Sequence, residues 1–289
     1  MTDTALDDRR KVRESTRVEG QNARSWQLVS ALQTAMFDTA QLGRADQIVL
    51  DLEDAIDGSL KQFARDNVVE WLRAGGSAWV RINDWTTVDW SDDIAALAGV
   101  PGLQGVMLAK TEAAEQATDT FQRLGGATPV VTLIESALGI ESAIEIARAR
   151  GTFRLAFGSG DYRRDTGASN TPLAMAYPRT RLVLASRIGG LPGPIDGPTV
   201  ASTHPVLREQ AADGVALGMT GKLCLDMEQP SVINESMSPS PADVAWALDF
   251  LAKFEADGRV IRDGSDKPRL ARAETIRRRS EIFHIQPNS

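Results

Sequence analysis

The chain has 289 residues, of which 42% are hydrophobic, and it carries a net charge of -7 at pH 7. This composition predicts a globular protein with a large core, of a size that suits one barrel-sized domain as well as two smaller ones. The acidic balance argues against a nucleic-acid-binding protein, and no apolar segment has the length of a membrane span or the form of a signal peptide. We therefore expect a cytoplasmic protein with no nucleic-acid or membrane partner.

Short apolar strands alternate with helical patterns from residue 25 to residue 225. The expected strands are Ser25–Ser30, Gln47–Asp51, Ala78–Ile82, Gly105–Ala109, Val130–Ile134, Leu155–Gly158, Pro194–Asp196 and Gly221–Leu225. The expected helices are Leu60–Ala74, Trp90–Ala98, Thr111–Leu124, Gly139–Arg150, Pro172–Gly189 and Pro205–Leu217. These repeated units favour a (β/α)₈ TIM barrel over a doubly wound sheet, because polar residues end several different strands instead of gathering at one switch point.

The pattern changes on either side of this barrel. Residues 1–24 are polar and charged and predict a tail, whereas residues 25–237 hold the expected barrel domain. After two prolines that break the pattern, Asp243–Asp257 predicts an amphipathic helix, and a loop at Arg259–Pro268 precedes a last basic helix. We therefore expect residues 238–289 to form a helical extension that packs on the barrel or on a neighbouring subunit.

The cysteine and histidine residues offer no obvious catalytic group. Cys224 is the one cysteine, which excludes an intramolecular disulfide, and its apolar strand pattern predicts a buried thiol. His204 precedes a proline at a helix start, and His284 lies in the C-terminal tail. None of the three is expected to act as nucleophile or general base.

Two neighbouring strands are each followed by an acidic residue. Glu135 comes directly after Val130–Ile134, and Asp161 comes shortly after Leu155–Gly158. The carboxyl ends of parallel strands face the same rim of a barrel, so the two carboxylates are expected to lie together. Two hard oxygen ligands leave most of a Mg²⁺ octahedron open for water and a chelating substrate. The sequence therefore predicts a divalent-cation site for Mg²⁺, with Mn²⁺ as an alternative.

Charged residues also follow the strands before this pair. Asp51, Glu53 and Asp54 end the second strand, Arg81 lies in the third, and Lys110 follows the fourth. Each has a simpler interpretation, because an Asp often caps the next helix and a Lys often ends a strand in solvent. Their coincidence at every rim position favours an active site.

Motifs in this region occur in an order and at a spacing that resemble a known family. They are Asp51-Leu52-Glu53-Asp54-Ala55-Ile56, Lys61, Ala64-Arg65, Arg81-Ile82-Asn83, Met107-Leu108-Ala109-Lys110-Thr111-Glu112, Ile134-Glu135-Ser136, Gly139, Phe157-Gly158, Asp161 and Gly167. With them the chain resembles the citrate lyase β-subunit-like proteins of the HpcH/HpaI aldolase superfamily of CoA-ester lyases. The resemblance covers nearly the whole chain after Arg24.

The resemblance implies roles for single residues. Glu135 and Asp161 match the Mg²⁺ ligands of the family, and Arg81 matches a residue that binds substrate and stabilises developing negative charge, as a permanently charged guanidinium can. Glu53 and Asp54 resemble groups that hold the water molecules around the cation. Glu53 is also a candidate catalytic residue.

The C-terminal extension resembles the lid of the family. Asp266 lies where family members carry an Asp that reaches the active site of an adjacent subunit as acid or base, and such proteins form trimers or hexamers. The simpler interpretation is a turn Asp, favoured by the nearby Gly264. Because the loop also contains Gly258 and several charged residues, it suits movement between open and closed positions.

A glycine-rich run lies beside the predicted cation site. Gly158-Ser159-Gly160 is interpreted as slack in the backbone next to the metal, because Gly-x-Gly without a third glycine is a weak phosphate motif. Gly158 and Ser159 are predicted to contact substrate. The chain departs from the family at Gly160, where many members have Glu, at Asp226-Met227, where they have His-Pro, and at Ser30-Ala31, where Pro is usual. These departures concern substrate choice more than fold.

The resemblance implies a Mg²⁺-dependent carbon–carbon lyase that cleaves or forms a 3-hydroxyacyl-CoA thioester. Citramalyl-CoA or malyl-CoA would give acetyl-CoA and a 2-keto acid such as pyruvate or glyoxylate. One alternative is a citrate lyase β-type subunit that acts on a citryl thioester bound to an acyl carrier. Another is a barrel that binds metal and keto acid without turnover.

Overall fold

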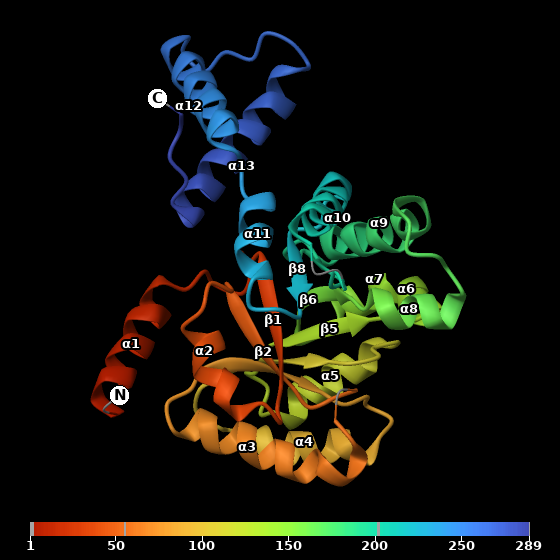
Figure 1. Ribbon diagram of the computed structural model, residues 1–289. Coiled ribbons are helices and arrows are strands. Elements are labelled where there is room, and N and C mark those ends of the chain that lie inside the picture. Colours follow the sequence, from red (N-terminus) through yellow and green to blue (C-terminus); the bar gives the residue numbers. More distant parts are fainter. Residues whose placement is uncertain (1–2, 55, 201–202, 289) are drawn as a thin grey trace. The chain divides into compact units, whose positions relative to one another are not determined.

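The computed structural model describes residues 3–54, 56–200 and 203–288 (Figure 1). Parallel strands pair in sequence order and close into a barrel, in which β1 also pairs with β8. The strands are β1 (Ser25–Ser30), β2 (Gln47–Asp51), β3 (Ala78–Ile82), β4 (Leu103–Leu108), β5 (Val130–Ile134), β6 (Thr152–Phe157), β7 (Ile195–Asp196) and β8 (Gly221–Cys224). The predicted TIM barrel is therefore confirmed.

Helices connect the strands around the outside of the barrel (Figure 1). They are α2 (Phe37–Gln41), α3 (Lys61–Arg73), α4 (Val88–Leu97), α5 (Ala114–Arg123), α6 (Ala137–Glu141), α7 (Ala143–Arg148), α8 (Ser159–Thr166), α9 (Pro172–Gly189), α10 (His204–Leu217) and α11 (Gln229–Ser236). The helix expected at Gly139–Arg150 is two helices that meet at Ser142, and α8 was not expected. Within the described residues, no helix is long and apolar enough to cross a membrane.

Alternate residues of the strands fill the interior of the barrel. Trp26 of β1 and Trp79 of β3 meet edge to face, with ring centroids 5.1 Å apart, and both are buried. A side chain at position 105 would collide with the Trp79 ring at 2.2 Å, so Gly105 makes room for it. The opposite faces of the strands pack on the helices, as layered βα units require. Cys224 is buried, as predicted.

A set of fully paired charges lies between β7, β8 and α9. Asp196 accepts hydrogen bonds from Arg179 at 2.8 and 3.1 Å and from the Lys222 ammonium at 3.0 Å. Lys222 also donates to the carbonyl oxygen of Gly197 at 2.6 Å. Burial opposes the ionisation of Asp196, but the two cations outweigh it and lower the pKa of this carboxyl.

The N-terminal segment that was expected to be a tail contains helix α1 (Asp3–Thr16). It has little apolar surface to pack, and arginines attach it to the barrel instead. Arg10 donates to the carbonyl oxygen of Ala74 at 2.7 Å and to Asp38 at 2.5 Å, and Arg13 donates to the carbonyl oxygen of Ala45 at 2.6 Å. The sequence does not predict this helix, because it is attached by hydrogen bonds from arginine side chains to backbone carbonyl groups. Such contacts require no apolar stripe, and the stripe is the pattern from which an amphipathic helix is predicted.

Residues 237–289 form a second compact unit, separate from the unit of residues 1–236. It contains α12 (Pro241–Ala256) and α13 (Asp266–Phe283), which pack against each other. Arg272 bridges the two helices, because it pairs with Asp243 at 3.2 Å and lies over the Trp246 ring at 4.9 Å. The helix expected at Asp243–Asp257 is thus present, and it begins two residues earlier.

Candidate active site

Glu135 lies at the carboxyl end of β5 and is nearly buried, with 5% of its surface exposed. Its Oε1 accepts a hydrogen bond from the backbone N–H of Lys110 at 2.9 Å. Lys110 has a φ of 50°, in the left-handed region that few residues other than glycine adopt. A Cβ at position 158 would lie 2.1 Å from Oε2 of Glu135, so Gly158 leaves the space that this carboxylate needs. The backbone around Glu135 is therefore shaped to hold it in one place.

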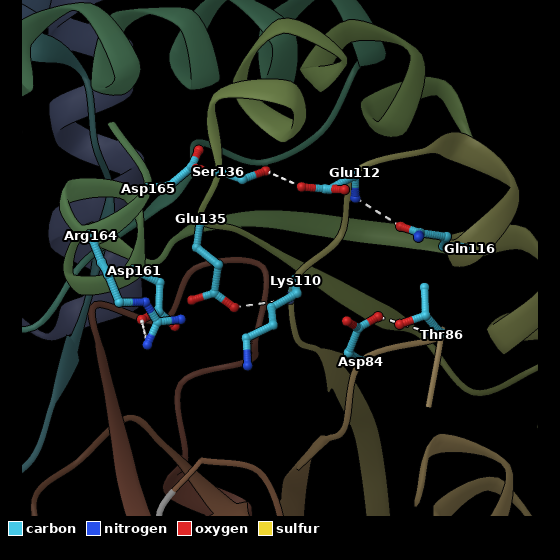
Figure 2. A pocket seen from close by; sticks show the side chains of 10 residues that line it. All are labelled: Asp84, Thr86, Lys110, Glu112, Gln116, Glu135, Ser136, Asp161, Arg164 and Asp165. Atoms are coloured by element: carbon cyan, nitrogen blue, oxygen red, sulfur yellow. Dashed lines mark hydrogen bonds and ion pairs between the residues drawn. The ribbon is translucent and has the colours of Figure 1, made fainter. Parts of the chain in front are cut away.

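Asp161 lies in the first turn of α8 and not at the end of a strand. Strand β6 ends at Phe157, and the chain then turns directly into Ser159–Thr166. Gly160, which was interpreted as slack, belongs to this helix, and a Cβ there would touch nothing within 4 Å. Figure 2 shows Asp161 on the same side of the cavity as Glu135, and Arg164 Nη1 lies 3.2 Å from its Oδ1. The helix still brings the two predicted metal ligands to one cavity.

The surroundings of Glu135 oppose its ionisation. Burial raises the pKa of Glu135 to about 8, and the charges of Glu53 and Asp161 raise it further, against the hydrogen bond from Lys110 and the charge of Arg81. A carboxylate held in such surroundings favours a bound cation, and carboxylate oxygens are the ligands that Mg²⁺ prefers.

The number of carboxylate ligands in the cavity also fits Mg²⁺. Among the described residues there is no group of three or more His, Cys, Asp or Glu side chains arranged to hold a metal ion. Mg²⁺ usually takes one or two carboxylates and keeps several water or substrate ligands, so it does not need a larger protein cage. Glu135 and Asp161 are sufficient for such a site, and their role as its ligands stays a prediction.

Arg81, in contrast, is paired with acidic residues of the protein. Its Nε and Nη2 donate to the two oxygens of Asp51, each at 2.7 Å, and its Nη1 lies 3.3 Å from Oε2 of Glu53. The Nε and Nη2 edge of the guanidinium therefore faces an acid of the protein. Contact between Nη1 and substrate stays a prediction. Asp51 fixes the orientation of the guanidinium through the bidentate pair.

Lys110 joins this network to the cation side of the site. Its ammonium donates to Glu53 at 2.5 Å and to Asp54 at 2.9 Å. Burial raises the pKa of Glu53, and a hydrogen bond with Asp54 raises it further. Burial also opposes the ionisation of Asp54, but hydrogen bonds with Glu53 and Lys110 outweigh it and hold its pKa at about 2. The two acids therefore differ in proton affinity, and Glu53 is the better proton carrier of the two.

A cavity of about 300 Å³ opens beside these groups (Figure 2). Its lining residues are Asp84, Thr86, Lys110, Glu112, Gln116, Glu135, Ser136, Asp161, Arg164 and Asp165. Two predicted residues, Glu135 and Asp161, are among them, while Arg81, Glu53, Asp54, Gly158 and Ser159 are not.

Sequence reasoning assigned no role to several of the lining residues. Arg164 and Asp165 follow Asp161 by three and four positions, the spacing that puts residues on one face of a helix, but this signal is useful only once α8 is recognised. Glu112 was part of a quoted motif; its Oε1 accepts a hydrogen bond from the Ser136 hydroxyl at 2.5 Å. Asp84 comes three residues after Arg81.

Asp266 lies in the second compact unit, at the start of α13. Its Oδ2 accepts a hydrogen bond from the backbone N–H of Arg262 at 2.7 Å, which closes the loop before the helix. This contact is the turn role named as the simpler interpretation. A catalytic role for Asp266 stays a prediction.

Comparison with protein families gives matches over both units. Residues 24–227 match the family described as HpcH/HpaI aldolase/citrate lyase, and residues 242–284 match the HpcH/HpaI aldolase C-terminal domain.

Individual relatives agree with this match. A citrate lyase subunit beta-like protein of Deinococcus radiodurans is 30% identical over 256 residues, which cover 80% of this chain and 88% of the relative. An L-malyl-CoA/beta-methylmalyl-CoA lyase of Cereibacter sphaeroides is 28% identical over 292 residues, which cover 86% of this chain and 92% of the relative. Among solved structures, CitE of Mycobacterium tuberculosis in complex with magnesium, acetoacetate and coenzyme A aligns with a TM-score of 0.75 at 28% identity, over 90% of this chain and 99% of that one.

Proposed function

Because this chain belongs to the HpcH/HpaI aldolase/citrate lyase family, we propose that it is a Mg²⁺-dependent carbon–carbon lyase acting on a 3-hydroxyacyl-CoA thioester. Cleavage would give acetyl-CoA and a 2-keto acid, as from citramalyl-CoA or malyl-CoA. The observation that carries the proposal is the pair of carboxylates, Glu135 and Asp161, in one cavity beside the network around Arg81.

The cation would be held by Glu135 and Asp161, and Mn²⁺ could replace Mg²⁺ because both prefer oxygen ligands. When bound, such a cation polarises a carbonyl oxygen and lowers the cost of negative charge on it. The chain itself fixes the position of Glu135 through the backbone of Lys110 and the space at Gly158. The citrate lyase beta subunit of Mycobacterium tuberculosis has been solved with oxaloacetate and magnesium, and CitE of that organism with magnesium, acetoacetate and coenzyme A, which supports a Mg²⁺ site in this chain.

Cleavage requires two proton transfers. The 3-hydroxyl group loses its proton, the carbon–carbon bond breaks as the new carbonyl forms, and the electron pair moves onto the thioester as an enolate that must gain a proton. Arg81 can stabilise the enolate oxygen through Nη1, since Asp51 already holds its other edge. Glu53, whose pKa is raised, is a candidate proton carrier on this side of the site.

The family resemblance supports a second proton carrier, Asp266 of a neighbouring subunit. In this proposal the chain assembles as a trimer or hexamer, and the loop before α13 closes over the site of the adjacent copy. Gly158 and Ser159 would then face the bound substrate from the start of α8. Mixing Asp266→Ala and Arg81→Ala subunits and measuring the activity of the hybrid assemblies tests this part of the proposal.

A citrate lyase β-type role has a specific observation in its favour. The citrate lyase subunit beta of Leuconostoc mesenteroides is 27% identical over 286 residues, which cover 91% of this chain and 94% of that protein. Such a subunit would use a citryl thioester on an acyl carrier instead of a free CoA thioester.

The test is thioester cleavage by the isolated full chain with and without Mg²⁺. Malyl-CoA, citramalyl-CoA and citryl-CoA are offered separately, and the release of keto acid is followed. Magnesium-dependent turnover of any free CoA thioester supports the proposal and excludes both a carrier requirement and a barrel that only binds. No turnover of all three, by protein shown to bind Mg²⁺, would contradict the proposal.

A further inference from the structure

Lys61 is the first residue of α3, and only 8% of its surface is exposed. Its ammonium donates to the backbone carbonyl oxygen of Leu52 at 2.7 Å, to that of Glu53 at 2.8 Å and to Oδ1 of Asn83 at 2.6 Å. These three hydrogen bonds use all three donors of an ammonium group. Lys61 is one of the motif residues that resemble the family, and the reaction proposed above gives it no part.

The two carbonyl groups belong to the peptide units on either side of the Glu53 α-carbon. Rotation about φ or ψ of Glu53 turns one of these planar units relative to the other, so it breaks at least one of the two hydrogen bonds to Lys61. The backbone N–H of Glu53 is fixed as well, because it donates to Oδ1 of Asp51 at 3.0 Å. Lys61 therefore fixes the direction in which the Glu53 side chain leaves the backbone.

The two carbonyl groups do not need Lys61 in order to be hydrogen-bonded. The Leu52 oxygen also accepts a hydrogen bond from Nδ2 of Asn83 at 3.1 Å, and the Glu53 oxygen accepts one from the backbone N–H of Ile56 at 3.1 Å. Burial of an ammonium group is costly, and neither of these carbonyl groups requires it. The contacts of Lys61 are therefore better explained by the position of Glu53 than by the hydrogen-bonding needs of the loop.

The position of Glu53 decides two contacts of the network around Arg81. Oε1 of Glu53 accepts a hydrogen bond from the Lys110 ammonium at 2.5 Å, and Oε2 lies 3.3 Å from Nη1 of Arg81, the donor proposed to meet the enolate oxygen. Only 2% of the surface of Glu53 is exposed, so the side chain has little room to reach these partners from another backbone direction. A rotation of the backbone at Glu53 would separate its carboxyl group from both cations.

We propose, resting on the function proposed above, that Lys61 is a positioning residue for the reaction. Through the two peptide units that flank Glu53, Lys61 holds the carboxyl group of Glu53 against Arg81 and Lys110, where it acts as the proton carrier proposed above. Lys61 acts on the reaction only through Glu53. Its removal should therefore have no effect on turnover beyond the loss of what Glu53 does.

Three variants of the full chain test this role. Lys61→Met removes the three donors and keeps the apolar part of the side chain, and it should fold because both carbonyl groups keep a second donor. Lys61→Gln keeps an amide donor and is the conservative variant. Arg65→Lys is the matched control, since Arg65 lies one turn later on α3, is similarly buried and loses part of its pairing with the acids of α4, which begins at Val88.

Hydrogen exchange of the backbone N–H groups of Glu53 and Ile56, measured for single residues, shows how firmly the loop is held and needs no substrate. Exchange of both groups should be about tenfold faster in Lys61→Met, because the hydrogen bonds that oppose local opening are lost. The increase should be smaller in Lys61→Gln. Arg65→Lys should exchange at the native rate at these two positions.

Turnover in a double-mutant cycle gives the second readout. Glu53→Gln should lower turnover by about 100-fold, as the loss of a proton carrier does, and Lys61→Met should lower it by about tenfold or more. Because Lys61 acts through Glu53, the double variant should lie within about threefold of Glu53→Gln alone. A lysine that only supported the fold would instead multiply the two losses, and Arg65→Lys would then lower turnover as well.

Two results would overturn the inference while the proposed function stands. Native exchange rates at Glu53 and Ile56 in folded Lys61→Met would show that the ammonium does not hold the loop. Independent effects of Lys61→Met and Glu53→Gln on turnover would show that Lys61 does not act through Glu53. If the native chain cleaves none of the thioesters while exchange in Lys61→Met is faster as expected, the proposed function fails and the positioning of Glu53 by Lys61 stands.

Discussion

Two buried carboxyl groups of the barrel, those of Glu135 and Asp196, lie in opposite electrostatic environments. Asp196 is completely buried but contacts Arg179 and Lys222, and its pKa is lowered. Glu135 is nearly as buried, faces other acids, and has its pKa raised to about 8. Burial alone therefore does not distinguish a structural acid from a site acid. The protein supplies the countercharge at Asp196, whereas at Glu135 we propose that a bound cation supplies it.

The largest expected effect is a loss of stability when Asp196, the acid paired with two cations, is replaced. Asp196→Asn leaves two buried cations without their anion, and we expect the free energy of unfolding at pH 7 to fall by about 3–5 kcal/mol. The matched variant Glu135→Gln removes a carboxyl whose ionisation is opposed by burial and by neighbouring acids, and it should leave the metal-free fold as stable as before, or more stable. Chemical denaturation in the presence of a chelator measures both, and equal destabilisation by the two variants would contradict the comparison.

The same pair gives a pH dependence with a defined sign. Because the pKa of Asp196 is lowered on folding, its stabilisation is fully present above its unfolded pKa of about 3.9 and disappears as the pH falls through the lower folded value. The difference in unfolding free energy between the native chain and Asp196→Asn should therefore be constant near neutrality and shrink in acid. A difference that grows below about pH 4 would show that the sign is wrong.

The next effect concerns the orientation of Arg81. Arg81→Lys keeps the charge but loses the paired hydrogen bonds with Asp51, so we expect turnover to fall on the order of 100-fold while Mg²⁺ binding persists. Steady-state kinetics and calorimetry on the same preparation separate the two quantities. Turnover near the native value would refute a role for Arg81 in the reaction.

A smaller effect is expected from subunit mixing. Asp266→Ala and Arg81→Ala should each be nearly inactive, and a mixture should regain part of the activity through hybrid sites that carry both native residues. Native mass spectrometry must first show that hybrids form. Verified hybrids without recovered turnover would mean that Asp266 acts within its own chain or has only the turn role seen at Arg262.

The barrel could be predicted from the sequence because short, largely apolar strands alternate with helical patterns, and polar residues mark the ends of several strands. Glu135 could be found for the same reason, since it follows β5 directly. Helix α1 could not, because arginine contacts with backbone carbonyl groups attach it and leave no apolar stripe. A periodic pattern reports packing and not hydrogen bonds of this kind.

Within the site, the missing information was the set of partners of each charge. The sequence indicates that Arg81 and Lys110 end neighbouring strands, but not that Arg81 pairs with Asp51 or that the Lys110 backbone bends to hold Glu135. The first contact depends on the register between β2 and β3, and the second depends on the left-handed backbone conformation of Lys110. Arg164 was missed because α8 begins directly after β6, where the glycines were interpreted as slack.

The most direct test of the central claim is titration of Mg²⁺ into the native chain, Asp161→Ala and Asp165→Asn by calorimetry. Asp165 is a matched control, since it lines the same cavity on the same helix and its hydrogen bond from Ala137 survives as Asn. We predict that the native chain and Asp165→Asn bind Mg²⁺ alike, and that Asp161→Ala loses binding while its circular dichroism and unfolding free energy stay close to native values, because a rim residue supports little packing. Unchanged Mg²⁺ affinity in folded Asp161→Ala would contradict the assignment of Glu135 and Asp161 as the cation site.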